Sequence, residues 1–232
     1  MTTELTTLQG ISSMATRAML AELARSCPLE CAVDAHFESV GGVDAARRVR
    51  EGEAFDVVVL AGDAIDKLIA AGSVLADSRA DLVVSKTVVA VPRDSQGFDV
   101  STEQALRQAV LEARAIGHST GPSGTAVLGL LQRWGVLDAV RDRLVQAPPG
   151  VPVGRLLEQG QATLGFQQTS ELLGLDGVRV LGELPAGCEI VTRFTAGVCT
   201  VSRRQQAARA LVAYLASPRT AAIKRAHGME PA

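Results

Sequence analysis

A run of small and hydroxylated residues from Ser119 to Gly124 directly precedes an amphipathic segment, and it is the stretch of this chain best suited to hold a ligand. Pro122 suits the first position of a helix, because it has no N–H to lose and its φ is already helical. The N–H groups just after it then lack intrahelical acceptors and present a partial positive charge to an anion. The candidate contacts in this turn are Ser119, Thr120, Gly121, Ser123 and Gly124.

The same turn lacks the marks of a nucleotide-binding loop. The lysine and spacing of G-x-x-x-x-G-K-[ST] are missing, and so is the glycine order G-x-G-x-x-G. A capped helix without any ligand is the plainer interpretation of the local sequence, because such caps are common.

Similar residues recur after other predicted strands, which favours a ligand site over a simple cap. In open α/β sheets, ligands lie at the carboxyl ends of the strands, where such turns gather. Hydroxyls, amides and helix N–H groups without an obligatory charge partner suit a small desolvated anion. These further candidates are Ser12, Ser13, Ser39, Gly62, Gln167 and Gln168.

Chemistry on a bound anion would need a base, and three titratable residues stand near predicted strand ends: Glu38, Asp63 and His118. His118 is the most suitable by type, since imidazole titrates near neutral pH. The alternatives are a structural, hydrogen-bonded His118 and a helix cap for Asp63. No G-x-S-x-G elbow supports a hydrolase, and no metal site or cofactor is expected.

Strands and helices alternate along almost the whole chain. Residues 4–11, 30–40 and 55–62 are predicted to form three strands, each followed by a helix, and this predicts a parallel sheet with right-handed crossovers. A strand at 86–92 opens a second set of units, and two helices end the chain, the first capped by Ser202. The absence of a linker predicts lobes joined by strands that cross between them.

Composition and charge exclude several classes of partner. The chain has 232 residues, 47% of them hydrophobic, and a formal net charge of -2, which gives no basic field for nucleic acid. No apolar run approaches the ~20 residues that span a membrane, and the start lacks the features of a secretory signal, so a cytoplasmic protein is expected unless a leader has been removed. The four cysteines are expected to be buried free thiols.

The segments STGPSGTAVLGLLQRWG and APPGVPVGRLLEQGQATLGFQQTSELL, with the serines of ISSM and ESVGG, resemble the substrate-binding proteins of ABC transporters. The similar branch is that of the molybdate-binding proteins, which also includes enzymes like aconitate isomerase. The resemblance implies an α/β fold of two Rossmann-like lobes with a ligand cleft between them, the type 2 periplasmic-binding-protein fold. It places residues 1–84 and 190–232 in one lobe and residues 85–189 in the other.

The resulting expectation is binding of a small anion, a di- or tricarboxylate, in that cleft. One alternative is an enzyme like aconitate isomerase, which shifts a double bond in a carboxylate, and another is a molybdate or oxyanion transport receptor. A transporter permease is expected as a partner only if the protein is exported, in which case its place is the periplasm. Neither nucleic acid nor membrane insertion is expected.

Overall fold

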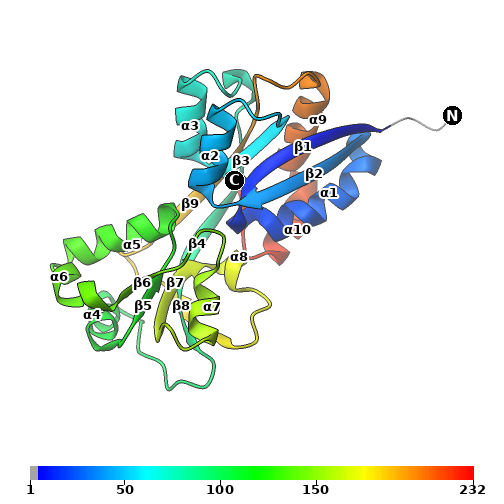
Figure 1. Cartoon of the computed structure of the whole chain (residues 1–232). Coiled ribbons are helices and arrows are strands. Elements are labelled where there is room, and N and C mark those ends of the chain that lie inside the picture. Colours follow the sequence, from blue (N-terminus) through cyan, green and yellow to red (C-terminus); the bar gives the residue numbers. More distant parts are fainter. Residues whose placement is uncertain (1–4) are drawn as a thin grey trace. The chain divides into compact units, whose positions relative to one another are not determined.

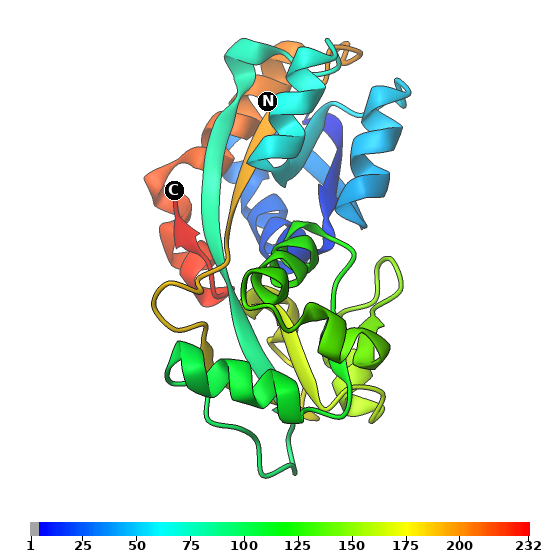
Figure 2. The same ribbon diagram turned by 90° about the vertical axis from the view of Figure 1, so that its left-hand side faces the viewer.

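The computed structural model describes residues 5–232, without the side chains of residues 28–30. The chain forms two compact units, residues 1–85 with 193–232 (unit 1) and residues 86–192 (unit 2). Strand β4 (Ala80–Pro92) belongs to both units, since the division falls after Ser85, and β9 lies beside it (Figure 2).

Unit 1 is built on parallel strands that alternate with helices (Figure 1). Strand β1 pairs in parallel with β2 on one side and β3 on the other, whereas β9 pairs with β3 in the antiparallel direction. The elements of unit 1 besides β4 are β1 (Thr6–Ser13), α1 (Arg17–Cys31), β2 (Val33–Val40), α2 (Gly42–Arg50), β3 (Val57–Ala61), α3 (Gly62–Ala70), β9 (Val191–Val198), α9 (Gln205–Ala216), α10 (Ala221–Ala226) and β10 (Glu230–Pro231).

Both faces of the unit 1 sheet are covered, which explains why all five residues of β3 are buried. Val57 and Val59 of β3 pack with Leu20 of α1 and with residues of α9. Val58 and Leu60 point to the other face and pack with residues of α2 and α3. The alternation of side chains along one apolar strand therefore supplies two cores.

Unit 2 has the same layered design. Strand β7 pairs in the antiparallel direction with β4 and in parallel with β5, which pairs in parallel with β6. Val89 and Phe166 face a core shared with α4 and α5, and Val88 faces a core shared with α7. The elements are α4 (Glu103–Glu112), β5 (Ile116–His118), α5 (Pro122–Arg133), α6 (Leu137–Val140), β6 (Leu144–Gln146), α7 (Val153–Glu158), β7 (Leu164–Gln168), α8 (Thr169–Leu172) and β8 (Val178–Glu183).

The prediction that Ser202 caps the penultimate helix is wrong. Helix α9 begins three residues later, and Ser202 Oγ instead donates a hydrogen bond of 2.6 Å to Asp56 Oδ1. Asp56 is buried and accepts a second bond of 2.9 Å from the Gln9 backbone N–H. One carboxylate thus joins β1, the start of β3 and the turn before α9, a use that spacing along the chain does not reveal.

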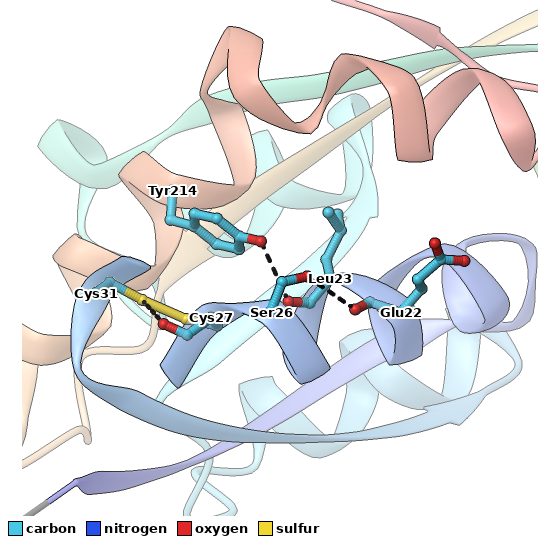
Figure 3. Close-up of a disulfide and its surroundings, with 6 residues drawn as sticks. All are labelled: Glu22, Leu23, Ser26, Cys27, Cys31 and Tyr214. Carbon is cyan, nitrogen blue, oxygen red and sulfur yellow. Dashed lines mark hydrogen bonds between the residues drawn. A yellow bond between two sulfur atoms is a disulfide. The ribbon is translucent and has the colours of Figure 1, made fainter. Parts of the chain in front are cut away.

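The prediction that all four cysteines are free thiols is wrong for two of them. Cys27 and Cys31 form a disulfide in the last turns of α1, where the Tyr214 hydroxyl donates to the Leu23 carbonyl of the same helix (Figure 3). Cys188 and Cys199 are buried free thiols, and burial raises the pKa of Cys199 to about 12.

We predict that Ser202→Ala lowers the free energy of unfolding by about 1–2 kcal/mol, because Asp56 loses one of its donors in a buried position. Urea unfolding followed by circular dichroism measures the change. Ser101→Ala, at an exposed serine, is the control and should shift the midpoint little. Equal effects of the two substitutions would contradict a structural role for the Asp56 contact.

We also predict the state of the thiols. Alkylation of the unfolded, unreduced protein should label two cysteines, and alkylation after reduction should label all four. Peptide mass mapping identifies the protected pair as Cys27 and Cys31. Labelling of four cysteines without reduction would show that the pair is not oxidised in the isolated protein.

Candidate functional site

Ser12 and Ser39 lie side by side at the carboxyl ends of two neighbouring parallel strands. They are direct partners in the register of β1 and β2, and their Oγ atoms are 2.8 Å apart. The Ser12 side chain is fully buried, and its hydroxyl also approaches the Ser13 carbonyl at 3.3 Å. The structure therefore brings these two predicted residues together as a hydroxyl pair.

Ser13 points to the opposite face of β1, because successive side chains of a strand alternate. Its Oγ is buried and has no hydrogen-bond partner among the described residues. A Cβ built on Gly42, the first residue of α2, would lie 3.8 Å from Ser13 Cβ, so the hydroxyl is next to the start of this helix. No side chain caps α2, and its first N–H groups together with Ser13 form a set of uncharged donors.

Gly62 has different surroundings from the three serines. It is the first residue of α3, and a Cβ there would lie 3.2 Å from Thr195 Oγ1 and 3.5 Å from an Arg79 guanidinium nitrogen. Arg79 forms ion pairs with Asp66 and Asp81, and Thr195 donates to Asp81 at 2.7 Å. Gly62 thus adjoins a charged network whose groups are already paired.

The predicted turn in unit 2 has the expected helix start, with Gly121 as the cap residue and Pro122 in the first helical turn. Ser119 Oγ lies 3.1 Å from Ser123 Oγ and accepts a bond of 3.3 Å from the Gly121 N–H. A Cβ on Gly124 would come within 1.9 Å of the Ser119 carbonyl oxygen, so this close return of the chain requires glycine. Thr120 is half-buried, and no contact ties its hydroxyl to the turn.

Gln167 and Gln168 point to opposite faces of β7, and their amides are in different states. Gln167 Oε1 accepts a bond of 3.2 Å from the Gly154 N–H, and its side chain also interacts with the Glu171 carboxyl. Gln168 Oε1 is buried without a partner. Gln167 therefore ties β7 to α7 and α8, whereas Gln168 keeps unused hydrogen-bonding capacity.

The structure adds residues that the sequence analysis missed. Thr87 of β4 lies directly opposite Gln168 in the antiparallel register, and its buried Oγ1 also has no partner. Ser85 and Ser170 likewise have buried hydroxyls without partners. The sequence did contain a hint, because the apolar strand segment SKTVVAV includes two hydroxylated residues, Ser85 and Thr87. Threonine is common in strands, so strand propensity alone does not single these residues out as ligand contacts.

The three candidate bases are in unlike environments. Glu38 forms a two-pronged ion pair with Arg48 on the surface, and these hydrogen bonds lower the pKa of Glu38. Asp63 is exposed, and its Oδ2 lies 3.8 Å from Lys67 Nζ. The residue at the N-cap of α3 is Ala61, so the prediction that Asp63 caps this helix is wrong. His118 is buried, and burial lowers its pKa.

The described part of the chain contains neither a cluster of metal-binding side chains nor a membrane-spanning helix. No group of three or more His, Cys, Asp or Glu side chains is placed to hold a metal ion. None of the helices in residues 5–232 has the length and apolar character needed to cross a membrane.

Comparison with known proteins then assigns the family. The model of the bacterial extracellular solute-binding proteins matches residues 8–230. The chain belongs to this family. The predicted resemblance is therefore confirmed, and so is the α/β fold of two-lobed binding proteins.

Two curated relatives are similar to this chain in sequence, and two solved structures are similar to it in fold. An aconitate isomerase of Pseudomonas sp. is 34% identical over 79% of this chain and 70% of its own length. The molybdate-binding protein ModA of Azotobacter vinelandii is 29% identical over 78% of this chain and 73% of its own length.

The structures share the fold at lower identity. The periplasmic molybdate-binding protein of A. vinelandii superposes with a TM-score of 0.80 at 20% identity, covering 96% of this chain and 98% of the other. The sulfate-binding protein SubI of Mycobacterium tuberculosis gives 0.79 at 15% identity, covering 97% and 87%.

Glu171 generates a prediction about stability. Burial raises the pKa of its carboxyl from 4.5 to about 7, so the folded protein keeps a proton that the unfolded chain has lost between these values. The free energy of unfolding should therefore fall by about 2 kcal/mol as the pH rises from the lower to the higher value. Urea unfolding at several pH values should show this slope, and Glu171→Gln should flatten it.

The control for this titration is Glu183→Gln, at an exposed carboxylate of β8. It should leave the pH slope of the wild-type protein in place. A Glu171→Gln variant with the wild-type slope would show that a different group carries the titration.

Proposed function

We propose that this protein binds small anions that carry carboxylate groups at uncharged donors, which form one cluster in each unit. Cluster 1, at the end of β1, consists of the Ser12–Ser39 hydroxyl pair on one face of the sheet and of Ser13 with the start of α2 at Gly42 on the other. Cluster 2 consists of the Ser119–Gly124 turn with Thr87 and Gln168. Gly62 and Gln167 also remain proposed contacts, but with less support, because the polar groups around them already have hydrogen-bond or ion-pair partners.

The observation that carries the proposal is the presence of buried hydroxyls that have no partner among the described residues, one at the end of β1 and one opposite the last residue of β7. A buried polar group without a hydrogen bond costs about 1–3 kcal/mol, so a folded chain keeps one where a ligand completes it. Ser13 Oγ and Thr87 Oγ1 are both in this state. Ser13 follows Ser12, which is paired with Ser39 in the neighbouring strand. Thr87 lies opposite the amide side chain of Gln168.

The charge of the two clusters supports an anion over a cation or a neutral sugar. The starts of α2 and α5 carry the positive ends of helix dipoles, and no side chain caps either helix. Glu171 lies near Gln167, but burial raises its pKa to about 7, so well below that pH it adds little negative charge.

The choice of carboxylates within the class of anions is supported by the relative at 34% identity, whose name is aconitate isomerase. That relative also supports a second candidate function, isomerisation of an unsaturated carboxylate. The other named relative binds molybdate, which makes a tetrahedral oxyanion the competing ligand class.

The disulfide of α1 bears on where the protein works. Disulfides persist in oxidising compartments and are rare in the cytosol. It therefore favours a protein that acts outside the cytoplasm, as the description of its family also does. In that setting the permease of an ABC transporter becomes the proposed partner.

The test uses two variants that remove one orphan hydroxyl each, Ser13→Ala and Thr87→Val. Without ligand, both should melt at or slightly above the wild-type temperature, since a buried unsatisfied group is lost. With citrate or trans-aconitate, measured by calorimetry, each should bind about 10- to 100-fold more weakly, as expected for one lost hydrogen bond to a charged group.

Ser101→Ala, at an exposed serine, is the control and should bind like the wild-type protein. Wild-type affinity in both variants would contradict the two clusters as contact surfaces. A wild-type protein stabilised by molybdate or sulfate and by no carboxylate would keep anion binding and overturn the carboxylate class.

A further inference from the structure

The three histidines of this chain differ in what holds them. His36 Nε2 lies 3.0 Å from Asp34 Oδ2 on an exposed strand face, and His227 Nε2 lies 2.8 Å from Glu22 Oε2. His118 is only 5% exposed and has no carboxylate partner in the part of the chain that the structure describes. No ion pair therefore offsets the cost of burying the charged form of this ring.

The one hydrogen bond of the His118 ring fixes its tautomer. Nδ1 lies 3.1 Å from the Ser119 carbonyl oxygen, which is only an acceptor, so Nδ1 must carry the proton. The neutral ring then has its lone pair on Nε2. No residue from 5 to 232 with a described side chain donates to that nitrogen.

The protonation state of the ring suits a base. Burial lowers the pKa of His118 below 6.5, and the bond to the Ser119 carbonyl only partly offsets this. No charged side chain contributes to the shift. The imidazole is therefore neutral at pH 7, with a lone pair available.

His118 directly precedes the proposed anion contacts along the chain. His118 is the last residue of β5, and the Ser119–Gly124 turn begins with the next residue. The same Ser119 whose carbonyl holds the ring also places its hydroxyl 3.1 Å from Ser123 Oγ. Ser119 therefore contacts the His118 ring through its carbonyl oxygen and the Ser123 hydroxyl through its side chain.

We propose that His118 Nε2 is the base that moves a proton between two carbons of an unsaturated di- or tricarboxylate held by the Ser119–Gly124 turn. This inference rests on the proposed function, since it needs a carboxylate bound at cluster 2. It goes further in assigning the residue and the atom that would move the proton in the isomerisation named there as the second candidate.

The step is balanced without a co-reactant. Nε2 takes a proton from a methylene carbon next to the double bond and a carboxylate, and the C–H electron pair spreads over the three carbons and the carboxylate oxygens. The imidazolium then returns the proton to the far carbon of the former double bond, which leaves the double bond shifted by one position. The N–H groups at the start of α5 stabilise the charge that develops on the carboxylate.

The experiment follows cis- and trans-aconitate in D₂O by proton NMR with the wild-type protein, His118→Gln and the control His36→Gln. The wild-type protein and the control should exchange the methylene protons and interconvert the isomers. His118→Gln should still bind within about threefold of wild type and lose at least 100-fold in exchange rate, the usual contribution of a general base.

Further readouts do not depend on the variant folding. The pH profile of wild-type kcat/KM should lose activity on the acidic side with a pKa below 6.5, and nitrogen NMR should show the His118 proton on Nδ1. Absence of the acidic limb, or a proton on Nε2 in the free protein, would overturn the assignment.

The outcomes separate this inference from the proposed function. Binding of carboxylates without exchange by the wild-type protein overturns the inference and leaves the binding function in place. Failure to bind any carboxylate overturns both. Exchange at the wild-type rate by His118→Gln shows that another group is the base.

Discussion

The arrangement of both units depends on a constraint of the backbone, namely that the first N–H groups of a helix have no partner within it. In unit 1, parallel β1 and β2 end beside each other and lead into α1 and α2. In unit 2, β5 leads through a tight turn into α5. Helices α2 and α5 start without a side-chain cap, so their donors stay free for another acceptor.

The polar groups near these helix starts are mostly hydroxyls and amides, and the one acidic side chain in the first turn of α2, Asp44, is paired with Arg47. Arg48 and Arg79, for example, are bound to carboxylates in networks on the surface. A site of neutral donors suits a desolvated anion, because no ion pair must be broken to bind it. The carboxyl of Glu171, which lies close to Gln167, is compatible with an anion nearby, because burial raises its pKa to about 7 and keeps it mostly protonated below that pH.

The sequence predicted the fold class and the order of elements well, because apolar runs, glycines and prolines determine them locally. Pro122 at the start of α5 and Gly52 and Gly228 after α2 and α10 are examples. The prediction for Ser202 failed because it depended on a contact between distant segments. Ser202 looks like a cap in sequence, but its partner is Asp56, 146 residues away. The surroundings of Thr87, Gln167 and Gln168 could be known only from the register of β4 against β7. The disulfide between Cys27 and Cys31 was not predicted, because both cysteines lie in the same helix. The predicted ligand contacts themselves stay predictions.

The most direct test of the account is a titration of the nitrogen-labelled protein with citrate, observed through its backbone amide resonances. An anion held by helix starts should shift the amide protons of Gly42, Ser123 and Gly124 strongly and saturably, since hydrogen bonds to carboxylate deshield them. Amides of the exposed segment around Ser101 should stay in place. Saturable binding that leaves all three amides unmoved would contradict the central claim that helix starts and their neighbouring hydroxyls hold the ligand.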